Sequence, residues 1–382
     1  MAETTTVAPT AGVRFTVASR PYRRFTNTQT VSNLSAVSFQ PIMLLATGFV
    51  RRISLFFQAS ATAASAGALV AGDGPWNLIA NVGLNDATGQ PIIQPVTGYN
   101  LYLINKYLSS GMEQGRGGFE TGDPQEGPEF AYSGSSTAFA ATFRLNLDLE
   151  QDAATGYGCI PNLDSNASLQ LKVDAAAVTV AYTGTTLTPS TLSVTVDQNY
   201  WAPVGPVSGG VAQQTTPDGY GDYLETRYET QTANASSENT LQINNRGGMI
   251  RGIIAISRAA GVRTAFTAGS NLGLILDNNA IDEGIKIETQ QNYLRRAYNY
   301  QGADLTTSYV PLSAVNPGLD RGVIVWPFFL GVANGRDTWL ATRVGSQLQV
   351  KLTPGASATQ IEFITQLMQV HARDTFFDRS QS

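Results

Sequence analysis

The chain has 382 residues and a formal net charge of −5, with 42% hydrophobic and only 14% charged residues. A core of ordinary size is therefore available, but a coat for nucleic acid is disfavoured, because it needs a basic face to neutralise phosphates. A single cysteine, Cys159, and a single histidine, His371, exclude an internal disulfide and a zinc site built from cysteine and histidine ligands.

The first thirty residues differ from the rest of the chain in charge and pattern. They lack apolar periodicity and carry four cations, Arg14, Arg20, Arg23 and Arg24. Such a segment predicts an extended or disordered arm, with ordered structure beginning near Val31. Two interpretations fit the arginines: contact with anionic lipid head groups, or packing of the arm against a neighbouring subunit.

Secretion and membrane insertion are both disfavoured. The first ten residues have neither the basic start nor the apolar stretch of a signal peptide. The most apolar segment, Pro41–Phe57, is interrupted by Arg51 and Arg52, and a spanning helix needs about 20 apolar residues. We therefore expect a protein that is made in the cytosol and stays soluble until it assembles.

The first half of the chain reads as short strands separated by turns. Apolar residues alternate over Ala140–Leu149, which is typical of a half-buried strand. Helical spacing of apolar residues predicts one short helix over Gly98–Leu108, and a long Gly-rich loop follows it up to Ser136. Further strands are expected at residues 48–57, 76–84, 168–173 and 192–196.

After a segment rich in proline and glycine the same pattern starts again. Strands are expected at residues 240–243, 248–257, 271–277, 322–330, 347–352 and 361–370, and a helix at 289–300. Four short strings recur in the same order in both halves, which indicates an internal duplication. The recurring pairs are Gly48–Ile53 with Gly248–Ile253, Asn77–Ile79 with Asn271–Gly273, Asn100–Tyr102 with Asn292–Leu294, and Leu169–Val173 with Leu348–Leu352.

These patterns predict an all-β protein of two tandem eight-stranded jelly rolls, a double jelly roll, with short flanking helices. A parallel α/β fold is disfavoured because the strands do not alternate with long helices. The expected division is an N-terminal arm at 1–30, a first jelly roll at 31–201, a linker at 202–239, a second jelly roll at 240–375 and a C-terminal tail at 376–382.

No catalytic, cofactor or metal site is predicted. Two carboxylate pairs, Asp148 with Glu150 and Asp282 with Glu283, could serve glycoside hydrolysis, but solvated loop ends are the simpler interpretation. The GRGG string at 115–118 lacks the lysine of a phosphate-binding loop. Asp73 and Asp123 could join a calcium site, but no ladder of ligands accompanies them. A hydrolase triad would have to use His371, close to the C-terminus.

The block GFVRRISLFF (Gly48–Phe57), the block GPWNLIANVGLNDATGQP (Gly74–Pro91) and the helix start GYNLYLIN (Gly98–Asn105) resemble the opening jelly roll of one known family. That family comprises the double jelly-roll major capsid proteins of tectivirus-type bacteriophages, which belong to the lineage that includes adenovirus hexon. The order of the later strands resembles that family up to about residue 375. The linker at 202–239 matches nothing in it.

The resemblance implies a structural protein of the virion, made in the host cytoplasm, and no enzyme. Its homotrimers would form pseudo-hexagonal capsomers that tile an icosahedral shell over an internal membrane. The implied partners are other copies of the chain, neighbouring capsomers, minor capsid and vertex proteins, and internal viral membrane lipids, but no sequence-specific nucleic acid. The four arginines would lie in an arm on the inner, membrane-facing side.

Two other functions remain open at this point. A two-module β-sandwich carbohydrate-binding protein or glycosidase would be monomeric, and would use Trp201 and Trp339 to stack on sugars. Trp76 and Trp326 instead lie within expected strand cores. A minor vertex or spike protein is the third option, but the duplication disfavours it.

Overall fold

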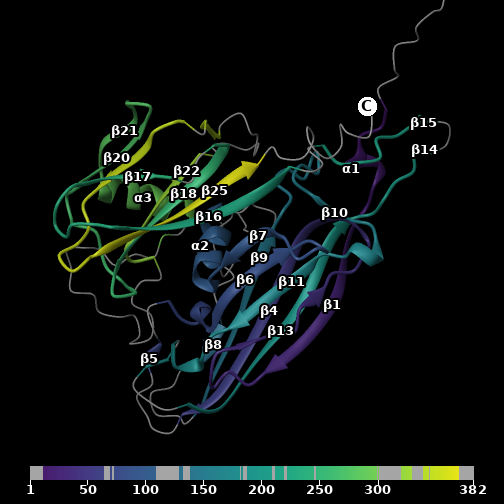
Figure 1. Ribbon diagram of the computed structural model, residues 1–382, viewed down its shortest axis with the longest axis horizontal. Coiled ribbons are helices and arrows are strands. Elements are labelled where there is room, and N and C mark those ends of the chain that lie inside the picture. The colour runs from purple at the N-terminus through teal and green to yellow at the C-terminus, as the bar shows by residue number, and fades with distance from the viewer. Residues whose placement is uncertain are drawn as a thin grey trace, which may run out of the picture.

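A computed structural model describes residues 12–63, 69–70, 73–108, 129–131, 138–180, 182–183, 187–208, 211–218, 222–244, 247–298, 300, 320–328, 339–343 and 345–369. These residues form antiparallel sheets and few helices, so the fold is all-β as predicted. The sheets belong to two bodies that lie next to each other (Figure 1), which we call the first and the second roll.

The first roll is a sandwich of two antiparallel sheets. One has the strand order β1-β13-β4-β9-β8, formed by β1 (Pro21–Val31), β13 (Leu187–Trp201), β4 (Gly48–Ala63), β9 (Ala138–Asp148) and β8 (Glu129–Ala131). The other has the order β2-β11-β6-β7, formed by β2 (Val37–Ser38), β11 (Gln170–Ala175), β6 (Ile79–Asn85) and β7 (Pro91–Val96). Helix α2 (Gly98–Leu108) connects β7 toward β8 and β9.

The second roll repeats this arrangement. Its first sheet has the order β16-β25-β18, formed by β16 (Tyr223–Thr232), β25 (Gln360–Gln369) and β18 (Met249–Ala259), with β22 (Val323–Pro327) paired to β18. Its second sheet has the order β17-β24-β20-β21, formed by β17 (Asn239–Ile243), β24 (Leu348–Leu352), β20 (Asn271–Leu276) and β21 (Asn279–Lys286). Helix α3 (Ile287–Tyr298) follows β21 as α2 follows β7.

Short elements complete the described chain. They are α1 (Phe15–Ala18), β3 (Ile42–Met43), β5 (Leu69–Val70), η1 (Trp76–Leu78), β10 (Ile160–Asn162), η2 (Ser165–Ala167), η3 (Val178–Val180), β12 (Tyr182–Thr183), β14 (Val207–Ser208), β15 (Val211–Ala212), β19 (Val262–Arg263) and β23 (Leu340–Ala341).

The internal duplication is visible in the strand register. In both rolls the first-sheet pairing skips one buried arginine, Arg51 in β4 and Arg251 in β18, which lie 200 positions apart. A β-bulge is a specific feature of a fold, so a bulge at the same position in both rolls supports the duplication. The recurring strings in β4 and β18, and in β11 and β24, therefore occupy equivalent places. The Asn77 string does not, because the pairing aligns Asn81 with Asn271.

Two predicted boundaries differ from the structure. Ordered structure does not begin near Val31, because β1 starts at Pro21 and pairs with β13 along its whole length. Before it, Phe15 of α1 is buried against Phe49 and Trp201. The expected linker at 202–239 contains β16, which pairs with β25 and is an integral strand of the second roll.

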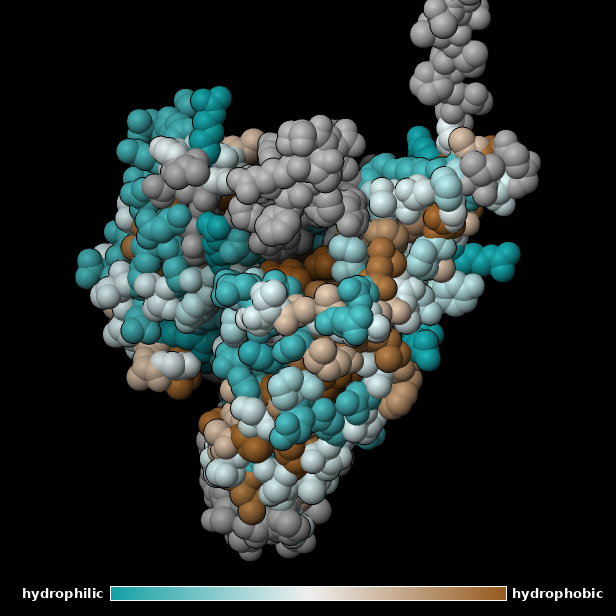
Figure 2. Space-filling view, turned by 45° about the vertical axis from the view of Figure 1, so that its right-hand side comes forward, coloured by the Kyte–Doolittle hydropathy of each residue, from teal (hydrophilic) through white to brown (hydrophobic). Residues whose placement is uncertain are grey.

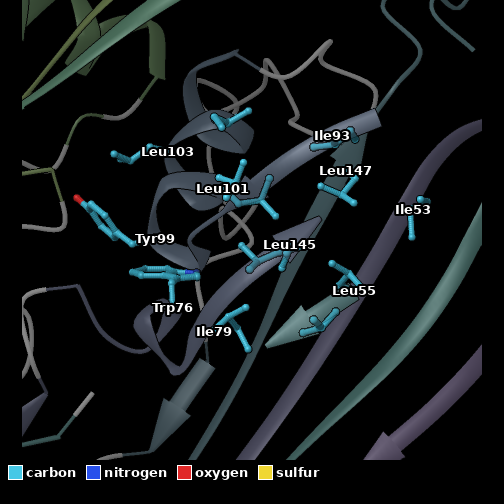
Figure 3. Packing of buried hydrophobic residues seen from close by; sticks show 14 of the residues in the cluster. Ile53, Leu55, Trp76, Ile79, Ile93, Tyr99, Leu101, Leu103, Leu145 and Leu147 are labelled. Atoms are coloured by element: carbon cyan, nitrogen blue, oxygen red, sulfur yellow. The ribbon is translucent and has the colours of Figure 1, made fainter. Parts of the chain in front are cut away.

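Apolar side chains from both sheets fill the first roll, and helix α2 closes one side of it. Figure 3 shows side chains of β4 and β9 pointing toward residues of α2 and toward Trp76 and Ile79. The alternation that predicted β9 is borne out, because its apolar members are buried and the residues between them are half-exposed. A separate cluster fills the second roll, built on Ile253, Leu274 and Phe363.

Candidate assembly surfaces

The interface between the two rolls is built on α2, which lies between them (Figure 1). This helix contacts β18 and β22 of the second roll, and Leu103 and Tyr107 belong to the same buried cluster as Ile254 and Val325. The approach is close at Gly252, where a Cβ atom would lie 2.3 Å from Leu108 Cδ2. The apolar face of α2 therefore serves as a core shared by both rolls.

Charged side chains surround this apolar contact and also cross between the rolls. Asp73 of the first roll accepts hydrogen bonds from Arg258 Nη1 at 2.7 Å and Arg263 Nε at 2.5 Å. Glu362 of β25 accepts from Arg258 Nε at 2.5 Å and from Asn100 Nδ2 of α2 at 2.7 Å. Burial alone would lower the pKa of Arg258, but the charges of Asp73 and Glu362 outweigh it and raise that pKa above its ordinary value.

A second ion pair between the rolls is more deeply buried. Lys106 Nζ of α2 donates to Asp320 Oδ2 at 2.6 Å, and the two side chains are 8% and 0% exposed. The ring of Tyr107 lies 5.4 Å from the same ammonium group. Burial raises the pKa of Tyr107 well above its ordinary value, and the charge of Asp320 acts in the same direction. Tyr107 is therefore neutral beside this pair.

The four predicted arginines lie on the outer edge of the first roll. Arg14 precedes α1, Arg20 precedes β1, and Arg23 and Arg24 are in β1; all four are exposed. They do not act as one group, because Arg23 donates to Asp197 of the neighbouring strand with an Nη2–Oδ2 distance of 2.5 Å.

The first carboxylate pair is neither a solvated loop end nor a glycosidase site. Glu150 is buried, pairs with Arg51 at 2.6 Å and accepts a hydrogen bond from Trp201 Nε1 at 2.6 Å. Asp148 pairs with Arg52, and both side chains are almost fully buried. These carboxylates neutralise buried arginines of the long strand β4, so their role is to stabilise the fold.

The other predicted polar sites do not converge either. Asp282 and Glu283 lie on strand β21 rather than in a loop, and Asp73 belongs to the contact between the rolls. Asp123, the GRGG string at 115–118 and His371 lie outside the described residues. Within the described part of the chain, no three His, Cys, Asp or Glu residues are grouped closely enough to hold a metal ion. The described helices also include none with the length and apolar character to cross a membrane.

The tryptophans do not form a platform for sugars. Trp76, Trp201, Trp326 and Trp339 are all buried. The guanidinium of Arg51 lies 4.3 Å from the centre of the Trp201 ring, and that of Arg251 lies 5.8 Å from the Trp339 ring. Both rings are therefore covered by arginines, which removes the stacking surface that a carbohydrate-binding protein would need.

A groove marks the outer rim of the contact between the rolls. It encloses about 520 Å³ between β7 and β16 and is lined by Gln94, Pro95, Arg227 and Tyr228 among others. Tyr228 is 56% exposed, and Arg227 pairs with Glu225 at 3.0 Å. On the face of the molecule that Figure 2 shows, hydrophobic side chains are scattered over the first roll, whereas the second roll is mostly hydrophilic.

The residues that join the rolls were not identified from the sequence. Lys106, Arg258, Arg263, Asp320 and Glu362 are far apart along the chain, and only the fold brings them together. One signal was present, because Arg258 and Glu362 interrupt or flank otherwise apolar strands. A charge in such a position needs a partner, which here comes from the other roll or from the neighbouring strand.

No protein-family model matches the sequence, and neither does any curated protein. Solved structures do match. A chain in the atomic structure of Sulfolobus turreted icosahedral virus (STIV) has a TM-score of 0.61 at 13% identity, over 93% of this chain and 92% of that one. The crystal structure of the STIV major capsid protein gives 0.57 at 13% identity, over 94% and 99%.

The Faustovirus major capsid protein is similar as well, with a TM-score of 0.54 at 10% identity over 97% of this chain and 92% of that one. In each case the match spans both rolls and the connection between them. At this level of identity the likeness establishes the fold, and the chain adopts the double jelly roll of viral major capsid proteins.

Proposed function

We propose that this chain is a viral major capsid protein whose homotrimers form pseudo-hexagonal capsomers, and that these capsomers tile an icosahedral shell. The observation that carries the proposal is the pair of rolls with one topology, joined through α2. Three copies around a threefold axis would present six similar lobes. The fold shared with the STIV and Faustovirus proteins supports the same role. The mechanism is assembly, without catalysis.

In this role the partners are other copies of the chain, first within the trimer and then in neighbouring capsomers. Minor capsid and vertex proteins would complete the shell. The protein would be made in the host cytoplasm and end in the virion. A net charge of −5 offers no general attraction to nucleic acid, so no sequence-specific contact with the genome belongs to the proposal.

The oligomeric state of the purified, untagged protein tests this function. We expect sedimentation at three times the chain mass of 40.7 kDa and, in negative-stain electron microscopy, threefold particles with a hexagonal outline. Bilobed monomers at every concentration would contradict the proposal.

An internal membrane beneath the shell is a further part of the proposal. Arg14 and Arg20 are the exposed cations closest to α1, and each arginine near an anionic surface contributes about 1 kcal/mol. We expect the protein to float with vesicles that contain phosphatidylserine and to stay behind with pure phosphatidylcholine. A variant carrying Arg14→Gln and Arg20→Gln should lose most of this binding. Equal flotation with both vesicle types would remove the membrane from the proposal.

A further inference from the structure

Each roll uses one of its edge strands to contact the other roll, and the equivalent edge strand of the other roll has no such contact within the described part of the chain. Within the chain, β7 of the first roll lies against β16 of the second. The strands equivalent to β16 and β7 are β1 and β21. Both are edge strands, and most of their residues are exposed. They lie at opposite ends of the molecule (Figure 1), so they cannot meet within one chain.

We propose that β1 of one copy binds β21 of a second copy, repeating between chains the contact that β16 and β7 make within a chain. The inference rests on the proposed capsid function and names the surface that builds the trimer. Because the two strands are different parts of the molecule, the contact is heterologous, and it closes into a ring if the rotation between copies permits.

The strand register identifies the residues that correspond in β1 and β16. Tyr228 of β16 is joined through β25 to Ile254, and Phe25 of β1 is joined through β13 to Ser54. Ile254 and Ser54 are 200 positions apart, like the two bulged arginines. Phe25 therefore corresponds to Tyr228, and both rings are exposed, 58% and 56% respectively.

The strand register also aligns β7 with β21. Leu84 of β6 and Leu274 of β20 each follow a glycine that pairs with a lysine of the adjacent strand. Gln94 comes directly after the residue that pairs with Leu84, and Glu283 comes directly after the residue that pairs with Leu274. Gln94 and Glu283 thus occupy equivalent positions.

The two contacts differ in chemistry at these positions. Within the chain, Gln94 and Arg227 line the same groove between the rolls. Between copies the corresponding residues are Glu283 and Arg24, which are both exposed and carry opposite charges. Among the described residues, neither of them forms an ion pair within its own chain.

Apolar surface lies beside these charges on both strands. Tyr22 and Phe25 are 47% and 58% exposed on β1, and Ile281 is 43% exposed on β21. A basic and aromatic edge therefore faces an acidic and aliphatic edge. Charge complementarity of this kind orients two proteins during encounter and disfavours the wrong register. It also assigns Arg24 to contact between copies rather than to lipid.

Charge reversal and rescue test the contact. We expect Arg24→Glu and Glu283→Arg each to raise the concentration at which the trimer dissociates by at least about tenfold, because each puts like charges together at every contact. The variant with both substitutions restores opposite charges and should return to the wild-type dissociation concentration. Lys172→Glu is the matched control, because it reverses an exposed strand cation on the other sheet and should leave the trimer unchanged.

Analytical ultracentrifugation over a range of concentrations gives the readout, and circular dichroism verifies that each variant is folded. Two weakened single variants that the double variant does not rescue would overturn the pairing of Arg24 with Glu283. Single variants that trimerise like the wild type would overturn the docking surface and leave the capsid proposal intact. A wild-type protein that never trimerises would instead overturn the capsid proposal itself.

Discussion

Cys159 illustrates how the interior of the first roll controls single side chains. The thiol is buried, and its Sγ lies 3.7 Å from Glu150 Oε1. Burial raises the pKa of this thiol well above its ordinary value, and the negative charge of Glu150 adds to the effect. The thiolate, which is the reactive form, is therefore suppressed in the folded protein.

Because the Cys159 thiol is buried, we expect the free energy of unfolding to fall at alkaline pH. The pKa of an unfolded cysteine is about 8.5, so above that pH the unfolded chain loses a proton that the folded chain keeps. The stabilisation is fully present below the unfolded pKa and is lost as pH rises toward the folded pKa. Urea unfolding at about pH 7 and about pH 10 measures the change. Cys159→Ala should show a smaller loss, and an equal loss in both proteins would contradict the expectation.

At the scale of elements, α2 is both a structural helix of the first roll and the surface on which the second roll rests. Its bounds, Gly98–Leu108, agree with the predicted helix because its apolar spacing depends on local sequence alone. The function of its outer face could not be predicted in the same way. That face is apolar because it meets β18 and β22, which are distant in sequence.

Strand β1 shows the opposite case. Its residues were expected to belong to an extended or disordered arm, because an edge strand exposed on both faces has no apolar alternation to signal it. Its order comes from pairing with β13, more than 160 residues away, which no local pattern reveals. The surface formed by β1 was therefore only partly predictable. The sequence shows that residue 24 is an arginine, but not that it lies on the edge of a sheet.

The buried ion pair between Lys106 and Asp320 joins α2 to the second roll. Asp320→Ala leaves a buried ammonium without its carboxylate, which should lower the free energy of unfolding by about 3–5 kcal/mol. Replacing both residues, with Lys106→Met and Asp320→Leu, should recover most of the loss, because neither charge of this pair then remains buried. Chemical denaturation of the three proteins provides the measurement. A loss below about 1 kcal/mol in Asp320→Ala would mean that water reaches the pair.

At the scale of the whole molecule, the apolar cluster that fills the first roll continues through α2 into the second roll, which also has a cluster of its own. Ion pairs that are largely buried join the two rolls as well. Their mutual orientation is therefore fixed by the same kinds of contact that hold each roll together. The proposed capsomer of three such chains would need this rigidity. If the rolls could pivot, β1 and β21 would have no fixed geometry in which to meet a second copy.

This shared core predicts that both rolls unfold in one cooperative transition. In calorimetry we expect a single peak whose calorimetric and van't Hoff enthalpies agree, coincident with the change in tryptophan fluorescence. The protein should be compared with Asp320→Ala, which removes the carboxylate of an ion pair between the rolls. That variant should show a broader or split transition, because each roll still has apolar residues packed between its own two sheets. Two resolved transitions in the wild-type protein would mean that α2 and the ion pairs do not couple the rolls, and that their orientation is set only on assembly.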